Sequence, residues 1–99
     1  MSLTNYFHDA EGDIVVAHDD QLCCCLRKFS CVVAELTGES LYSDKIDAEL
    51  VLAMNEKIQS IDLATVKSLD PDLTVEEWSW FQSLWNRHAQ QGHSMTSWW

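Results

Sequence analysis

Cysteine and histidine are the residues in this chain whose types could do chemistry. The cysteines are Cys23, Cys24, Cys25 and Cys31, and the chain also has four histidines. Zinc sites usually take their cysteines in pairs from turns, whereas an α-helix spreads three consecutive side chains over about 200°. Arg27 and Lys28 lie within one turn of Cys24 and could activate its thiol, but the sequence does not locate a partner histidine. We therefore predict no metal, no cofactor and no catalytic cysteine, and a thiol or metal protein remains an alternative.

Another possible chemical motif is His18-Asp19-Asp20, which contains the histidine–aspartate pair found in metal phosphohydrolases. That site needs further histidines and aspartates on other helices. Asp19 or Asp20 has a simpler role as the N-cap of a helix. Glycine-rich phosphate loops and paired acids in an apolar frame are also missing from the sequence. We expect that the protein is not an enzyme.

The elements that would position these residues are predicted to be helices. Apolar residues recur at helical spacing over residues 20–36, ending at Thr37-Gly38, and again from Ser43, the expected cap, to residue 61. In the second of these helices Lys45 and Glu49 are expected to pair one turn apart. Asp62 is expected to cap a short helix that ends before Pro71, and the sequence leaves the Asp70–Pro71 bond open between trans, the commoner form, and cis.

The last predicted helix has the clearest start. Thr74 and Glu77 match a capping box, Leu73 and Trp78 match a hydrophobic staple, and Gly92 is the expected end. The sequence thus predicts an all-α fold, with residues 1–99 as a single helical domain. It would be a small bundle of three main helices plus one short helix, with an irregular or hairpin N-terminal segment (1–18) and a C-terminal tail (92–99).

Five tryptophans, all after residue 77, are the strongest indication of binding. On the last helix Trp78, Phe81, Trp85 and His88 share one face, and Trp80, Leu84 and Gln91 share another. We expect Trp78 and Trp85 in the core, and Trp80, Trp98 and Trp99 exposed or docked on a partner. Four acids accompany them, so the predicted partner-binding residues are Trp80, Trp98, Trp99, Asp70, Asp72, Glu76 and Glu77.

The formal net charge of −10 restricts the partner. Six scattered basic residues cannot neutralise a row of phosphates, so direct nucleic-acid binding and binding to an anionic membrane are not expected. The expected partner is a protein with a basic surface. The first residues lack a cationic, apolar leader, which indicates a cytoplasmic protein with reduced thiols. The sequence does not determine whether the chain self-associates.

Small size, strong acidity and the lone Pro71 before the Trp78-Ser79-Trp80 helix together resemble small bacteriophage proteins that bind host enzymes, in particular the anti-RecBCD proteins of lambdoid phages. The resemblance is one of type and assigns no site residue. It implies a non-catalytic protein in the host cytoplasm that inhibits or modulates a larger nucleic-acid-processing enzyme, such as the RecBCD exonuclease/helicase. The alternative is a DNA mimic that occupies a DNA-binding channel by its charge.

Overall fold

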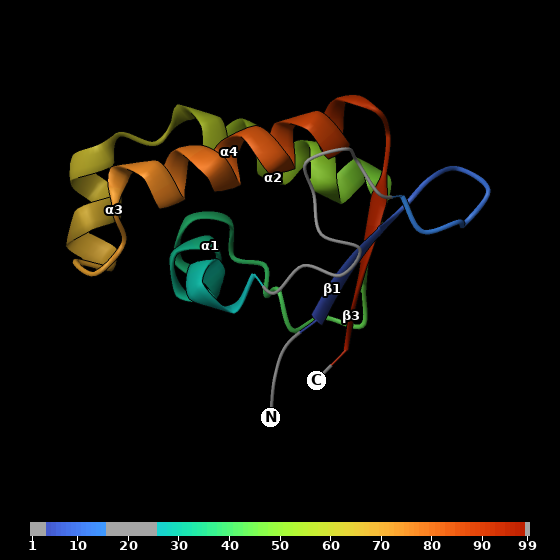
Figure 1. Cartoon of the computed structure of the whole chain (residues 1–99), viewed down its shortest axis with the longest axis horizontal. Helices are drawn as coiled ribbons and strands as arrows, with labels where there is room; N and C mark the ends of the chain where they lie inside the picture. Colours follow the sequence, from blue (N-terminus) through green and yellow to red (C-terminus); the bar gives the residue numbers. More distant parts are fainter. Residues whose placement is uncertain (1–3, 16–25, 99) are drawn as a thin grey trace.

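The computed structural model describes residues 4–15 and 26–98. In this part of the chain, helices and strands both occur, so the protein is mixed α/β and the all-α prediction is wrong (Figure 1). The elements in chain order are β1 (Thr4–His8), a 3₁₀ turn η1 (Arg27–Phe29), α1 (Ser30–Thr37), β2 (Lys45–Ile46), α2 (Ala48–Ser60), α3 (Leu63–Leu69), α4 (Val75–Gln90) and β3 (Ser94–Trp98).

The three strands form one antiparallel sheet in the order β1-β3-β2. The middle strand β3 lies in the segment for which a C-terminal tail was predicted, and that prediction is corrected. In the register of the sheet, Asn5 lies opposite Ser97 and Phe7 opposite Met95. The N-terminal hairpin prediction is partly right, because a turn follows β1, but the returning chain forms only a single bridge, between His8 and Ile14.

The strands were missed because two of the four inward positions of β1 and β3 hold polar residues, while Phe7 and Met95 hold the other two. A strand with one buried face should alternate apolar residues inward with polar residues outward. Here Asn5 and Ser97 point inward and are buried, whereas Tyr6 and Trp98 point outward. The asparagine side chain is satisfied inside: it donates to the Leu41 carbonyl (3.2 Å) and to Ser97 Oγ (2.9 Å), and it accepts from the Leu26 N–H (3.1 Å).

Two predicted helix starts are also corrected. The α-helix that was expected over residues 20–36 begins at Ser30, after the η1 turn; residues 16–25, with the predicted Asp19 or Asp20 cap, lie outside the described residues. Its end is confirmed, because Gly38 adopts φ 76°, a left-handed geometry that glycine favours.

The second corrected start is that of α2, which is capped by Asp47 rather than Ser43. The residues just before it, Lys45 and Ile46, pair with Thr96 and Met95 of β3, and this pairing ends any helix there. The Lys45 ammonium therefore lies 3.9 Å from the Asp47 carboxylate, in place of the expected pair with Glu49.

The last two helices follow the sequence prediction closely. The Asp62 side chain accepts from the Thr65 N–H (2.7 Å) at the start of α3, and the Thr74–Glu77 capping box is present at the start of α4. The bond before Pro71 is trans.

Helices α2 and α4 run side by side between the sheet at one end of the molecule and α3 at the other (Figure 1). A hydrogen bond joins the two helices, because the Nε1–H of Trp85 in α4 donates to the Val51 carbonyl in α2 (3.0 Å). Aromatic rings form a column along α4, in which Phe81 stacks on Phe29 of η1 and His88 stacks on Phe7 of β1 at 3.9 Å between ring centroids. This column joins the helices to the inner face of the sheet.

Candidate binding surfaces

The tryptophans divide as the sequence predicted between core and surface. Trp78 and Trp85 are buried, while the side chains of Trp80 and Trp98 are 42% and 68% exposed. Trp99 lies outside the described residues. The Trp80 ring lies beside Phe29, with 6.0 Å between the ring centroids. Trp98 makes no ring contact with any residue in the described ranges, so it is the more available of the two.

Trp98 belongs to a hollow on the outer face of the sheet, which we call the sheet groove. Its volume is about 760 Å³. Strands β1 and β3 supply most of its lining residues. The other two are Ile14, which follows the turn after β1, and Asp44, which precedes β2. The lining residues are Thr4, Tyr6, His8, Ile14, Asp44, Thr96, Ser97 and Trp98. Most of these residues were missed by sequence reasoning. Their spacing could have indicated a shared face, because every second residue of a strand lies on the same side. Thr4, Tyr6 and His8 have this spacing in β1, and Thr96 and Trp98 have it in β3.

Several polar groups of the groove already form hydrogen bonds within the protein. His8 Nε2 lies 2.7 Å from Thr96 Oγ1, and its Nδ1 lies 3.0 Å from the Gly12 carbonyl, so the imidazole bridges the sheet and the turn. The Tyr6 hydroxyl and the Asp44 carboxylate, by contrast, have no hydrogen-bond or ion-pair partner among residues 4–15 and 26–98. The groove therefore offers two aromatic rings and one unpaired carboxylate.

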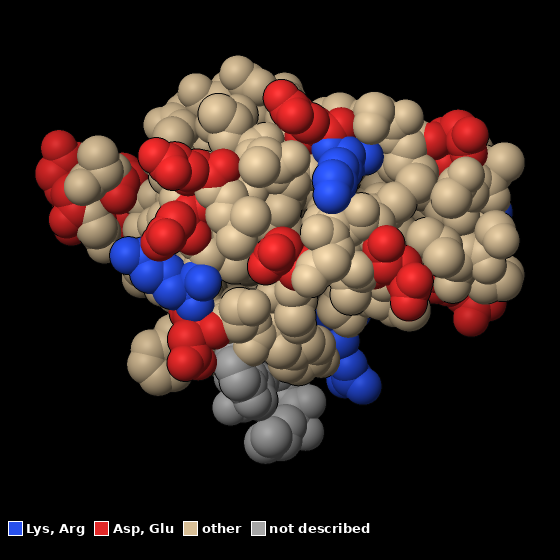
Figure 2. Space-filling model, turned by 180° about the vertical axis from the view of Figure 1, so that it is seen from behind, with Lys and Arg blue, Asp and Glu red and all other residues tan. Residues whose placement is uncertain are grey.

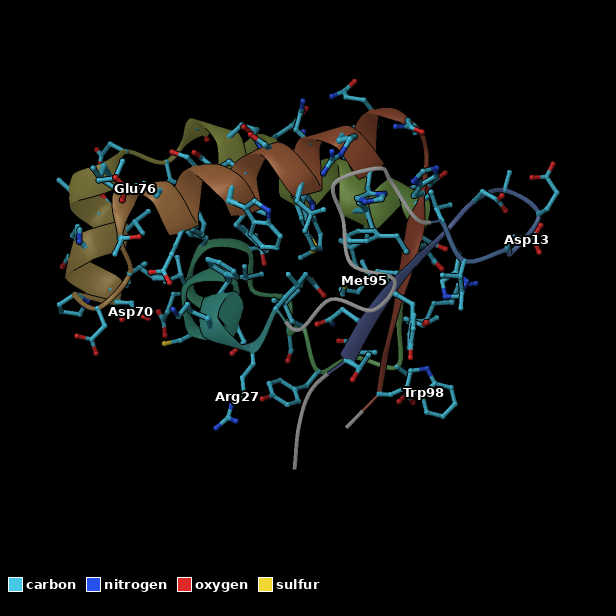
Figure 3. The ribbon with its side chains drawn as sticks, in the orientation of Figure 1. Asp13, Arg27, Asp70, Glu76, Met95 and Trp98 are labelled. Carbon is cyan, nitrogen blue, oxygen red and sulfur yellow. The ribbon has the colours of Figure 1, made fainter. Side chains whose placement is uncertain are left out.

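Further acids lie on the turn after β1, outside the lining of the groove. Asp9 organises this turn, because its Oδ1 accepts from the N–H groups of Glu11 and Asp13 (both 3.0 Å). Glu11 and Asp13 are exposed on a loop that projects from the sheet end of the molecule, where Figure 3 labels Asp13. Lys45, which lies opposite the groove residue Thr96, has its ammonium 3.9 Å from the Asp47 carboxylate. Asp44 is the one acid among the residues that line the sheet groove.

The predicted acidic site around Asp70 lies elsewhere. Figure 3 places Asp70 and Glu76 at the opposite end of the molecule from Trp98. The structure therefore does not bring the sequence-predicted partner-binding residues together in one patch. The predicted residues fall into an acidic end (Asp70, Asp72, Glu76 and Glu77), an isolated Trp80, and Trp98 in the sheet groove.

At the acidic end, some of the carboxylates form hydrogen bonds and an ion pair within the protein. Glu77 accepts from the Thr74 N–H (2.9 Å) and pairs with Lys28, and these two donors hold the pKa of its carboxyl below the usual range, with the lysine hydrogen bond as the larger cause. Asp70 Oδ1 accepts from the Asp72 N–H (3.1 Å). Arg27 and Lys28 line the same shallow hollow as Asp70 and Asp72, so this end is of mixed charge.

A buried histidine pair was not foreseen from the sequence. His88 Nδ1 and His93 Nδ1 lie 2.9 Å apart, so that one donates and the other accepts. Burial lowers the pKa of His93, and the negative charge of Asp9 opposes this shift. The pair joins the end of α4 to the start of β3. In the described residues no group of three or more histidine, cysteine or acidic side chains could hold a metal; Cys31 is exposed, and Cys23, Cys24 and Cys25 lie outside those residues.

Comparisons with protein-family models, with curated proteins and with solved structures gave no match in any of the three. Within the described residues, no helix has both the length and the apolar character needed to cross a membrane.

Proposed function

We propose that this protein is a non-catalytic acidic binding protein that inhibits or modulates a larger nucleic-acid-processing enzyme in the cytoplasm, such as the RecBCD exonuclease/helicase. The observation that carries the proposal is Trp98, a tryptophan that is 68% exposed in a groove of about 760 Å³ whose lining includes the Asp44 carboxylate. Large exposed aromatic side chains are concentrated where proteins bind each other. The chemistry of the surface therefore favours a protein partner.

The charge of the chain supports a basic partner surface. A net charge of −10 speeds association with a positively charged protein and makes this association sensitive to salt. Enzymes that process DNA carry basic surfaces along the path of the nucleic acid. The chain would bind such a surface with an aromatic contact at its centre and carboxylates around it.

A DNA mimic would need its charges in continuous rows. On the face seen in Figure 2, acidic side chains form separate groups with uncharged atoms between them and a few basic side chains among them. Two of the four acids at the acidic end, Asp70 and Glu77, already accept hydrogen bonds within the fold. This distribution favours binding through the sheet groove over charge mimicry.

The test measures the degradation of linear duplex DNA by purified RecBCD in the presence of increasing amounts of this protein. We expect inhibition or altered processing by the wild-type chain and a weaker effect at higher salt. Trp98→Ala should lose most of the effect, since truncating a central tryptophan of an interface costs about 2 kcal/mol or more of binding free energy.

The matched controls are substitutions away from the groove. Trp80→Ala removes the other exposed tryptophan of the described residues, and Asp72→Asn removes an acid that lines one hollow with Asp70, at the opposite end. Circular dichroism and urea unfolding must show that Trp98→Ala is folded. If inhibition survives Trp98→Ala but decreases evenly with every acid removed, the protein acts as a DNA mimic. If the wild-type chain neither binds RecBCD nor changes its activity, that enzyme is not the partner.

A further inference from the structure

The composition of the sheet groove restricts what can occupy it. Tyr6 and Trp98 stand on the same outer face of neighbouring strands, Tyr6 opposite Thr96 and Trp98 opposite Thr4. Their rings are thus diagonal neighbours on the sheet, at a separation that one long side chain can bridge. Asp44 lines the same hollow, and its backbone carbonyl accepts from the Ser97 N–H (3.3 Å), which fixes Asp44 beside the middle strand.

Purely apolar and anionic occupants fit this groove poorly. An apolar side chain over the groove would remove water from the Asp44 carboxylate without replacing its hydrogen bonds, which is unfavourable. A phosphate or a nucleic-acid strand would meet the negative charge of the Asp44 carboxylate in the groove. Aromatic strand residues can stack on nucleobases, but such sites combine stacking with a track of lysine and arginine. Lys45 is the only lysine or arginine on the described strands.

We infer that the sheet groove binds an arginine side chain of the partner protein, with the guanidinium plane on the Trp98 ring and its positive charge paired with the Asp44 carboxylate. Arginine is planar and weakly hydrated, and it can stack on an aromatic ring while it donates to a carboxylate. Its aliphatic stem would cover Tyr6 and Ile14. The identity of the protein that supplies the arginine rests on the proposed function. The preference of the groove for arginine rests on its lining residues alone.

The chain itself does not fill this role in the described residues. Lys45 lies opposite Thr96 on the outer face, yet it does not line the groove, and its ammonium lies 3.9 Å from the Asp47 carboxylate. Arg27 lies in η1 and lines the hollow beside Asp70 instead. The Asp44 carboxylate is therefore left for a cation from outside these segments.

The experiment is an NMR titration of the ¹⁵N-labelled full chain with an acetylated and amidated glycine–arginine–glycine peptide. The readouts are the indole N–H of Trp98 and the backbone N–H of Asp44, and the indole N–H of Trp80 serves as the control in the same spectrum. We expect saturable shifts at Trp98 and Asp44 and none at Trp80. The same peptide with citrulline, which keeps the shape but not the charge, should bind more weakly.

Two substitutions separate the aromatic and the ionic contributions. Trp98→Ala, read at Asp44, and Asp44→Asn, read at Trp98, should each weaken peptide binding by about two- to fivefold, the size expected for an exposed cation–π or ion-pair contact. Asp72→Asn at the acidic end should leave the affinity unchanged. Both groove residues are exposed, so these variants should fold normally, which their unchanged shifts elsewhere would verify.

Each other outcome overturns the inference. Equal binding of the arginine and citrulline peptides means that the groove recognises shape without charge. Shifts at Trp98 with single-stranded DNA and none with arginine mean that the groove stacks bases. Shifts that grow with protein concentration alone mean that a second copy of the chain occupies it, and no shift with any probe up to millimolar concentration means that the groove has no such site.

The titration and the RecBCD assay fail independently. If arginine binds at Trp98 but RecBCD is unaffected, the groove chemistry holds and the partner enzyme is a different one. If RecBCD is inhibited through Trp98 but the arginine peptide does not bind, the proposed function holds and the recognised group on the partner is not arginine.

Discussion

The sheet end and the α3–α4 end of this molecule use polar residues in opposite ways. At the sheet end, Asn5 and Ser97 are buried and hydrogen-bonded to each other, while Trp98 is exposed. At the α3–α4 end, Leu73 and Trp78 are buried, and the polar Thr74 and Glu77 cap the helix at the surface. The second arrangement follows the usual pattern of amphipathic elements, and the first one departs from it at this cross-strand pair, next to the buried apolar pair Phe7 and Met95.

This difference distinguishes polar residues that stabilise the fold from aromatic residues that are exposed and free to bind a partner. Around the start of α4, the polar groups satisfy backbone donors and pair with Lys28, so they contribute to stability. In the sheet, placing small polar residues inside leaves the large aromatic ones outside. Burying these polar residues has a cost, because each buried polar atom must keep its partner. We attribute the exposed aromatic groove to this arrangement.

Among the substitutions that test this comparison, we expect Asn5→Leu to have the largest effect on stability. The change leaves the Leu26 N–H, the Leu41 carbonyl and the Ser97 hydroxyl without the partner that they share. We expect the free energy of unfolding to fall by about 3 kcal/mol or more, measured by urea denaturation. Asp72→Ala, at an exposed site of the other end, should change it by less than about 0.5 kcal/mol. An equal and small effect of both substitutions would mean that the buried asparagine does not stabilise the sheet.

A matched pair of tryptophans in the shared core gives the next effect. Trp85 Nε1–H donates to the Val51 carbonyl, whereas Trp78 Nε1 is buried without a hydrogen-bond partner among the described residues. Both Trp85→Phe and Trp78→Phe lose ring volume, but only the first also loses a hydrogen bond. We expect Trp85→Phe to cost about 1 kcal/mol more than Trp78→Phe in thermal or urea unfolding. The reverse order would contradict the assigned bond.

Thr74→Ala tests the helix cap at the α3–α4 end. The hydroxyl accepts from the Glu77 N–H (3.1 Å), and its loss should reduce the free energy of unfolding by about 1 kcal/mol. Ser79→Ala, an exposed position in the same helix, is the control and should be neutral or slightly stabilising. The cap has no stabilising role if the two variants unfold at the same urea concentration.

The smallest expected effect is a pH dependence from His93. Burial lowers its pKa from the ordinary 6.5, so the unfolded chain binds a proton in a pH range where the folded chain does not. The stabilisation is therefore complete above this ordinary value and decreases as the pH falls from it toward the lowered pKa. Urea unfolding at pH 7.5 and at pH 5.5, which lie about one unit either side of the ordinary histidine value, should show this loss. His93→Gln should reduce it, and an unchanged loss in that variant would assign it to other groups.

The helical part of the fold was largely predictable from local signals. The Asp62 cap, the Thr74–Glu77 capping box and the end at Gly38 each depend on a few neighbouring residues, and each is confirmed. The burial of Trp78 and Trp85 followed from helical periodicity. These features are readable because the helix forms its hydrogen bonds within one segment of the chain.

The sheet and its groove were not predictable in the same way. β1 and β3 are separated by most of the chain, and each has one polar residue, Asn5 or Ser97, at an inward position where alternation would require an apolar one. Asn5 is acceptable in the interior only because Ser97, Leu41 and Leu26 supply its partners, and no local pattern contains that information. The groove residues Tyr6, Ile14 and Asp44 were missed for the same reason, since only the sheet brings them beside Trp98.

The middle position of β3 also determines when the sheet can form during synthesis. Residues 4–8 and 45–46 both pair with residues 94–98, and a ribosome makes the two outer strands long before the strand that joins them. Pairing across so large a sequence separation is slow, and unpaired strands in a nascent chain expose backbone groups that other chains can bind. The helices can assemble first, while the sheet groove exists only after residue 98 has left the ribosome. The nascent chain therefore cannot use the groove to engage a partner until β3 has been made.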